Sequence, residues 1–287
     1  MAALGGLIGR RAGVPVRPLS ALVFRLFSPA LIFHSLLTIS IERSLALRLV
    51  GVIAGVFVLV SIASFMVSKI LGHDRQTLAA VALCSAVTNS GNMGLPIAKL
   101  AFGDEGLKIA VVMYVVTALL TYSAGVVIAS LASEGTTRQA FVAPFKVPTL
   151  WAAAFALVLN ANDWHLPTAV DTVAATLAGA SIPVMLVVLG LQVLERSERT
   201  EGARDVASAV VLRLVGAPLA AWAATLVFSV TGVTQRTLIL TSGMPTAVMA
   251  SVLAMQYHAK PALVSRVVVI STLVSIATLT VLVTILT

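Results

Sequence analysis

The sequence predicts an all-α, polytopic membrane protein, and three observations support this fold class. The 287 residues are 59% hydrophobic and only 10% charged, whereas soluble domains carry about 25% charged residues. The charges gather in short clusters such as GRRAGVPVR and LERSERTEGARD. Between the clusters lie apolar runs of roughly 20 residues, long enough for a helix to cross about 30 Å of hydrocarbon. Outer-membrane strands would be shorter and would alternate in polarity.

These apolar runs predict a series of spanning helices, preceded by a short apolar stub, MAALGGLIG, that cannot cross a bilayer alone. In chain order the predicted spans are 18–40, 45–71, 77–100, 106–131, 147–162, 168–194, 206–230, 235–257 and 261–286. Within the second span, Val56 is expected to face lipid. Cys84, the single cysteine, lies inside an apolar run, so no disulfide framework is predicted.

Basic residues are unevenly distributed over the predicted loops, and this bias predicts the orientation of the chain. When the loop after the stub is placed in the cytoplasm, most Lys and Arg residues fall on that side. The opposite side then holds Arg43, Arg48, Lys99, Lys108 and Arg236. This interpretation also explains the net charge of +8 without a nucleic-acid partner, and it places the loop 132–146 in the cytoplasm.

Two pairs of landmarks recur at nearly the same offset, which indicates an internal repeat. Pro183 lies 154 residues after Pro29, and Tyr257 lies 155 residues after Phe102. Each unit then holds five helices, and an odd number inverts the second unit relative to the first.

The offset also defines the predicted domains. The stub corresponds to the end of a first helix, so that roughly ten further residues, about half a spanning helix, are expected upstream of it. The first repeat is predicted at 1–131 with an incomplete first helix, a short cytoplasmic linker at 132–146, and the inverted second repeat at 147–287.

Helix-breaking and polar residues interrupt two of the predicted spans, at TNSGNMGLP (88–96) and at TSGMPTAV (241–248). Such breaks are tolerated where protein or a water-filled cavity surrounds the freed backbone groups. Half-helix N-termini at two midplane breaks would direct positive dipole ends at a bound anion. The candidate binding residues are Asn89, Ser90, Gly91, Asn92, Pro96, Ser242, Pro245 and Thr246, with Tyr122 as a further candidate. Asn89 is expected both to cap its break and to contact a carboxylate.

Several kinds of chemistry are not indicated by the sequence. None of the eleven Asp and Glu residues lies at the centre of a predicted span, so no carboxylate proton relay is predicted. An HExxH motif, clustered Cys and His ligands and a Ser/His/Asp set are also missing. We therefore predict no enzyme activity, no cofactor and no metal. Arg25 and Arg213 lie inside predicted spans, and both are expected to extend to the membrane interface.

The interrupted segments resemble those of the auxin efflux carrier family. NSGNMGLPIAKLAFGDEGL resembles the first crossover of that family, and SGMPTAVMASVLAMQY resembles the second. LSALVFRLFSPALIF and ASIPVMLVVLGLQV resemble its proline-bearing second and seventh helices. The resemblance covers nearly the whole chain. By position, Asn89, Gly94 and Pro96 carry the first motif, and Pro245 carries the second.

This resemblance implies ten helices in two inverted five-helix repeats and the export of organic anions. The chain departs from the family pattern at Met249, where many members carry an amide. The long cytoplasmic loop of the plant exporters is absent, which indicates a bacterial-type member in the plasma membrane, the inner membrane of a bacterium.

The leading hypothesis is therefore a secondary efflux carrier for a small organic anion, such as a carboxylate, that works by alternating access. One alternative is a sodium-coupled symporter similar to the related bile acid carriers, which hold sodium with acidic and amide side chains. Another alternative is a membrane sensor or scaffold without transport. The expected partners are the anion and the lipid bilayer, without nucleic acid, and a homodimer is compatible with the sequence.

Overall fold

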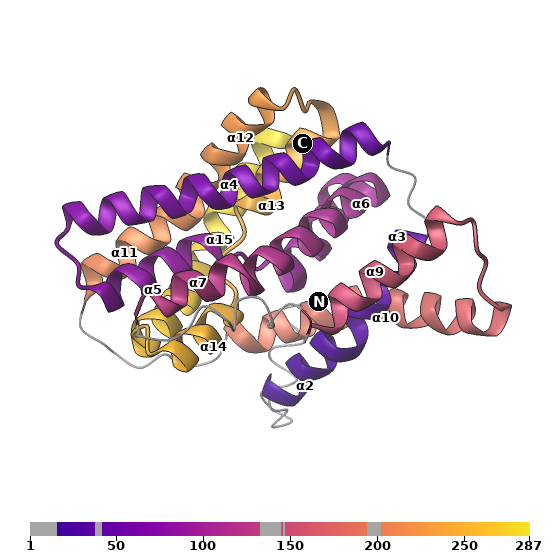
Figure 1. The fold of residues 1–287 in the computed structure, drawn as a ribbon, viewed down its shortest axis with the longest axis horizontal. Helices are drawn as coiled ribbons and strands as arrows, with labels where there is room; N and C mark the ends of the chain where they lie inside the picture. Colours follow the sequence, from indigo (N-terminus) through magenta and orange to yellow (C-terminus); the bar gives the residue numbers. More distant parts are fainter. Residues whose placement is uncertain (1–15, 38–41, 133–144, 146, 194–201) are drawn as a thin grey trace.

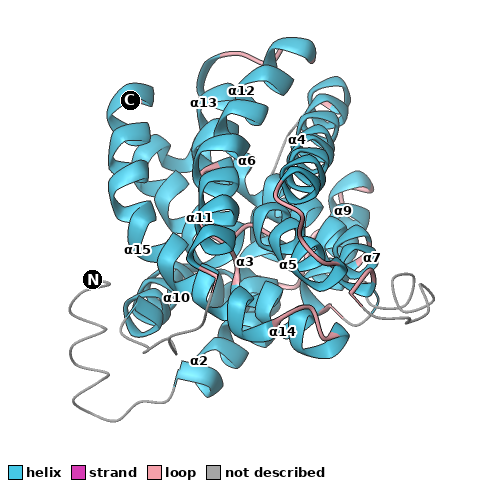
Figure 2. Cartoon of the chain, turned by 90° about the vertical axis from the view of Figure 1, so that its left-hand side faces the viewer, coloured by secondary structure: helices cyan, strands magenta, loops and turns pink. Residues whose placement is uncertain are grey.

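The computed structural model describes residues 16–37, 42–132, 145, 147–193 and 202–287, and this part of the chain is almost entirely helical (Figures 1 and 2). Among these described residues, five helical segments are long and apolar enough to cross a membrane. They are Ser44–Ile70, Ser90–Ser130, Thr168–Val188, Ala203–Val227 and Pro261–Leu286. The prediction of an all-helical, polytopic membrane protein is therefore confirmed. The stub and nearly all of the loop 132–146 lie outside the described residues.

The first half of the chain contains α2 to α7. They are α2 (Val16–Leu22), α3 (Ser28–Leu37), α4 (Arg43–Ile70), α5 (Arg75–Ala86), α6 (Leu95–Tyr122) and α7 (Ala124–Ser130). A π-helical turn at Val23–Phe27 joins α2 to α3, and another at Ser90–Gly94 leads into α6. Within α6, Gly103 has a φ of 65°, a left-handed conformation that glycine adopts readily. It divides α6 between the predicted spans 77–100 and 106–131.

The second half of the chain contains α9 to α15. They are α9 (Pro148–Ala161), α10 (Thr168–Val193), α11 (Ala203–Val211), α12 (Ala217–Val227), α13 (Gly232–Ser242), α14 (Val248–Tyr257) and α15 (Pro261–Leu286). A π-helical turn at Leu212–Gly216 joins α11 to α12. Within the described residues, each predicted span thus coincides with one helix or with consecutive helices, because hydrophobic length is a local property of the chain.

Each of the three π-helical turns in the described part of the chain ends two residues before a proline. The turn Val23–Phe27 precedes Pro29, Ser90–Gly94 precedes Pro96, and Leu212–Gly216 precedes Pro218. A proline cannot donate to the carbonyl four residues earlier, and its ring clashes with that carbonyl. Widening the preceding turn relieves the clash while the helix continues. The prolines therefore shape these helices without ending them.

The helices pack in two groups. In the first group, α3, α9 and α10 surround Ile32, Ala156 and Met185, and α6 also contacts this cluster. Figure 1 shows α2, α3, α9 and α10 together in the lower right part of that view. Two side chains tie the group together by long-range hydrogen bonds. Asn160 Nδ2 donates to the carbonyl oxygen of Leu37 at 2.7 Å, and Ser181 Oγ donates to that of Phe27 at 2.7 Å.

The second group contains both interrupted helices. Here α5, α7, α11, α14 and α15 pack around a core that includes Leu83, Ala129 and Ala254. A neighbouring core joins α4, α6, α12 and α13. Val56 belongs to this neighbouring core and is only 7% exposed, so the prediction that it faces lipid is wrong. The exposed side chain on this stretch of α4 is Val58 instead, at 53%.

Asp74 caps the N-terminus of α5 and connects it to α15. Its Oδ1 accepts hydrogen bonds from the Thr77 backbone N–H at 2.7 Å and from the Thr77 hydroxyl at 2.6 Å. Lys260, the residue before α15, lies 3.0 Å from Asp74 Oδ2. The Thr77 hydroxyl, followed by the Thr77 N–H and Lys260, lowers the pKa of Asp74 to about 2.

Replacing Asp74 with alanine is expected to destabilise the protein by about 1 kcal/mol, the usual cost of losing a helix cap. Because the folded-state pKa is depressed, the carboxylate stabilises the fold above its unfolded pKa of about 4 and loses this effect as the pH falls toward 2. Thermal unfolding of purified protein should show the gap between parent and Asp74→Ala narrowing below about pH 5. Gln76→Ala, an exposed change in the same helical turn, is the control. Identical melting of parent and Asp74→Ala at neutral pH would contradict the assignment.

Candidate functional site

The two interrupted helices meet at their breaks. Residues 87–89 and 243–247 are not helical, and within them Thr88 and Thr246 form an antiparallel β-bridge. The Asn89 N–H donates to the Pro245 carbonyl oxygen at 2.8 Å, and the Ala247 N–H donates to the Val87 carbonyl oxygen at 3.0 Å. Each break thus satisfies backbone groups of the other, which a break exposed to lipid could not achieve.

The place where the two breaks meet is called the crossing below. Thr246 connects the crossing to the surrounding helices by hydrogen bonds. Its hydroxyl donates to the Cys84 carbonyl oxygen in α5 at 2.8 Å. Its backbone N–H donates to Ser271 Oγ in α15 at 3.2 Å. Thr246 is fully buried, and these bonds direct its polar groups into the protein.

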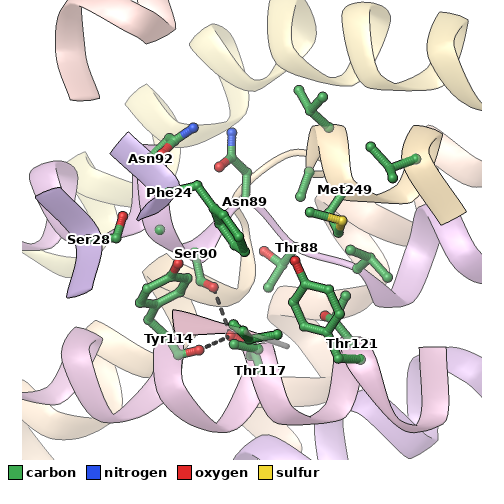
Figure 3. Close-up of a pocket in the computed structure, with 18 of the residues that line it drawn as sticks. Phe24, Ser28, Thr88, Asn89, Ser90, Asn92, Tyr114, Thr117, Thr121 and Met249 are labelled. Carbon is green, nitrogen blue, oxygen red and sulfur yellow. Dashed lines mark hydrogen bonds between the residues drawn. The ribbon is translucent and has the colours of Figure 1, made fainter. Parts of the chain in front are cut away.

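A cavity of about 270 Å³ lies on one side of the crossing (Figure 3). Its walls come from the first break, the start of α14, the second part of α6, and the segment joining α2 to α3. The polar lining residues are Ser28, Thr88, Asn89, Ser90, Asn92, Tyr114, Thr117, Thr121 and Tyr122. The apolar lining residues include Ala21, Phe24, Val147, Val248, Met249 and Val252.

Both half-helices that begin at the crossing start at the wall of this cavity. The helix that continues into α6 starts at Ser90, and α14 starts at Val248. The first N–H groups of a helix lack intrahelical partners, and each N-terminus carries roughly half a positive charge. The two N-termini together therefore place about one positive charge next to the cavity.

Two asparagine amides add hydrogen-bonding groups to the same wall. Figure 3 shows the amides of Asn89 and Asn92 above the rings of Phe24 and Tyr114 in that view. Asn89 makes no side-chain hydrogen bond to the helix that it precedes, so the expectation that its amide caps the break is wrong. The Asn89 N–H is paired through the backbone instead. Its side-chain amide can therefore both donate to and accept from a guest.

Opposite the amides, a hydroxyl pair joins the first break to the second part of α6. Ser90 Oγ and Thr117 Oγ1 lie 2.8 Å apart, and the Thr117 hydroxyl is also 2.8 Å from the Met113 carbonyl oxygen. Gly91 packs directly against the neighbouring aromatic ring, since a Cβ at this position would lie 2.9 Å from Tyr114 Cε2. Glycine therefore allows the backbone of the break to approach Tyr114.

The C-terminal ends of α5 and α13 lie on the other side of the crossing, and Arg213 binds them. Arg213 is only 2% exposed, so the prediction that it extends to the membrane interface is wrong. Its Nη1 donates to the Ser85 carbonyl oxygen at 2.6 Å, and its Nη2 donates to the Ser242 carbonyl oxygen. Burial of a charged side chain requires such partners, and these two half-helix ends supply them. Arg25, by contrast, is exposed.

The structure separates the predicted site residues into two sets. Asn89, Ser90, Gly91, Asn92 and Tyr122 line the 270 Å³ cavity. Pro96 is buried in the first turn of α6. The other three, Ser242, Pro245 and Thr246, lie in the second break but outside the lining of this cavity. The second break thus contributes Ala247 to Met249 to the wall rather than its hydroxyls.

Sequence reasoning missed several lining residues. Phe24 and Ser28 lie one helical turn apart at the junction of α2 and α3. Thr117 and Thr121 follow Tyr114 along one face of α6. The spacing of three and four residues places these groups on the same helical face, so this polar stripe in an apolar span was a usable signal.

Comparison with known proteins identifies the family. A family model described as "Membrane transport protein" matches residues 14–140 and 136–283. The chain belongs to this membrane transport family, that of the auxin efflux carriers. The resemblance of the interrupted segments is thereby confirmed, and the protein is a multi-pass membrane transporter from a family of transporters rather than enzymes.

Two archaeal relatives support this membership. An uncharacterized transporter of Methanothermobacter thermautotrophicus is 30% identical over 263 residues, which cover 91% of this chain and 86% of the relative. An uncharacterized transporter of Methanocaldococcus jannaschii is 24% identical over 221 residues, which cover 76% of this chain and 71% of the relative. Similarity to both transporters thus extends over most of the chain.

Proposed function

We propose that this transporter is a secondary carrier that exports a small organic anion, such as a carboxylate, through the cavity beside the crossing. The observation that carries the proposal is the convergence of two half-helix N-termini and two asparagine amides on one cavity. The roughly unit positive charge of the two N-termini would stabilise one negative charge there. Arg213 binds the C-terminal ends of the other two half-helices, α5 and α13. Its positive charge would offset the negative dipole ends there, so that they do not cancel the attraction of the N-termini for an anion.

The dimensions and walls of the cavity support a small organic substrate. Its volume of about 270 Å³ lies just below the range of about 300–1,000 Å³ that is usual for drug-sized ligands. Phe24, Val248, Met249 and Val252 form an apolar part of the lining. Met249, where many family members carry an amide, favours contact with a hydrocarbon portion of the substrate. The carboxylate would then bind at the asparagine amides.

Alternating access would arise from relative movement of the two helix groups. The cavity lies between Phe24, Ser28 and Val147 from the first group and the crossing in the second group. The proposed repeats, 1–131 and 147–287 joined by 132–146, would each contribute helices to both groups, as in other inverted-repeat transporters. Val147 precedes α9 at the predicted cytoplasmic end, so this conformation would open toward the cytoplasm.

The sodium-coupled alternative would require oxygen ligands for a cation near the breaks. In transporters with broken helices, unwound carbonyls and half-helix C-termini supply such ligands. Here the Ser85 and Ser242 carbonyl oxygens accept hydrogen bonds from Arg213. This arrangement favours an anion carrier that is driven by the anion gradient and the membrane potential.

Transport by inside-out vesicles or proteoliposomes tests the proposal with a panel of radiolabelled mono- and dicarboxylates. At least one carboxylate should be transported, and the flux should respond to voltage, which contributes about 2.3 kcal/mol per charge per 100 mV. Replacing sodium with choline should leave the flux unchanged. Protein-free vesicles and the lipid-facing variant Val58→Ala serve as controls. A strict sodium requirement would support the symporter instead, and absence of flux for every carboxylate would support the sensor or scaffold.

A further inference from the structure

Arg213 connects the two interrupted helices through their C-terminal ends. It lies in the π-helical turn between α11 and α12, and its guanidinium donates to carbonyl oxygens of Ser85 and Ser242. Ser85 lies in the last turn of α5, and Ser242 is the last residue of α13. A single buried cation is therefore shared by both half-helices that end at the crossing.

The electrostatics of these helix ends explain why a cation binds there. The last carbonyl groups of a helix have no intrahelical partner, and each C-terminus carries roughly half a negative charge. Arginine suits two such ends at once because its planar guanidinium presents several donors in a fixed geometry. A bound Na⁺ satisfies the same kind of carbonyl oxygens in other transporters with broken helices.

A second, much smaller cavity adjoins this contact. Its volume is about 20 Å³, and its lining includes Arg213, Ser242, Thr88 and Thr117. Among the described residues that line it, none is Asp or Glu. The Thr88 hydroxyl is buried and has no hydrogen-bond partner within the described part of the chain. Thr88 also lines the 270 Å³ cavity, so it separates Arg213 from the proposed substrate site.

We propose that Arg213 is a positioning residue that acts as a fixed internal cation and occupies the place of a coupling cation at the C-terminal ends of α5 and α13. It holds the two breaks in register while leaving the N-terminal ends free to attract an anion. Removal of the guanidinium would leave the Ser85 and Ser242 carbonyl oxygens and the Thr88 hydroxyl around an enlarged cavity. These oxygen atoms are suitable ligands for an alkali cation.

The test compares thermal unfolding of the purified parent, Arg213→Met and Arg213→Lys in sodium chloride and in choline chloride at equal ionic strength. The parent should melt at the same temperature in both salts. Arg213→Met should melt at least about 5 °C lower in choline, because it leaves two buried carbonyls unpaired. Sodium should then raise its melting temperature by at least about 2 °C through binding to the folded state.

Arg213→Lys keeps the charge. It should therefore melt at a higher temperature than Arg213→Met, and its melting temperature should be the same in sodium chloride and in choline chloride. Arg236→Met, an exposed change on α13, controls for the loss of an arginine. If Arg213→Met does not yield folded protein, Arg213→Gln takes its place in the same comparison.

Two results would overturn the inference. The first is an uncharged variant, Arg213→Met or Arg213→Gln, that melts at the same temperature as the parent in choline chloride. The second is an uncharged variant that melts below the parent but at the same temperature in sodium chloride and in choline chloride. That result would indicate that Arg213 has a packing role alone. Neither measurement requires a transported substrate, so this outcome is distinguishable from failure of the proposed function.

Discussion

Replacing Asn89 with alanine is expected to weaken binding of the transported carboxylate about ten- to a hundredfold. The lost hydrogen bond would involve a charged group, for which about 1.5–3 kcal/mol is typical, and about 1.4 kcal/mol corresponds to a tenfold change in affinity. Folding should be preserved, because the Asn89 side chain caps no helix. The backbone hydrogen bond from Asn89 to Pro245 remains available in the variant.

The measurement is binding and flux of the carboxylate that passes the transport screen, at matched expression. Asn89→Asp sharpens the test, since a carboxylate of nearly the same size would repel an anion and should reduce binding further. Val58→Ala is the matched control because Val58 is exposed on α4, whereas Val56 lies in the core. If Asn89→Ala binds and transports like the parent, the amide does not contact the substrate.

Replacing Gly91 with alanine is expected to reduce transport at least about tenfold and to destabilise the protein by about 1–3 kcal/mol, the usual cost of overpacking. The added Cβ would lie 2.9 Å from Tyr114 Cε2 and 3.2 Å from Tyr114 Cζ. Either the ring must move within the lining of the cavity or the backbone of the break must retreat. Both movements would displace Ser90 and Asn92, which flank Gly91 in the same wall.

Flux and thermal unfolding of Gly91→Ala measure both effects. Gly179→Ala is the control, because a Cβ on this glycine of α10 would meet no atom within 4 Å; it should be neutral or slightly stabilising. The double variant Gly91→Ala/Tyr114→Leu should recover part of the lost stability, since the smaller side chain leaves room for the methyl group. Equal losses in the single and double variants would show that the Tyr114 contact is not the cause.

The interrupted segments show how far the candidate site could be predicted from the sequence. Glycines, amides and prolines in the middle of apolar runs marked both breaks at the correct residues. The segment 88–92 was also expected to line a binding site, and its residues do line the cavity. For the second break the hydroxyls of Ser242 and Thr246 were the obvious polar candidates. The structure instead uses the Ser242 carbonyl for Arg213 and the Thr246 hydroxyl for Cys84.

The sequence by itself determined the apolar spans, the breaks and the family, because hydrocarbon thickness and the demands of an interrupted backbone act on local stretches of chain. Only the tertiary structure decided which face of each break lines the cavity. A polar group on a buried break can form hydrogen bonds with groups of several neighbouring helices, and the packing of those helices determines which bond forms. Arg213 and Val56 illustrate this limit. Both lie on apolar helices, and whether such a side chain contacts lipid or the interior depends on which neighbouring helix covers it. For Arg213 the covering groups are carbonyls about 130 and 30 residues away in the chain, and a pattern of local periodicity cannot reveal them.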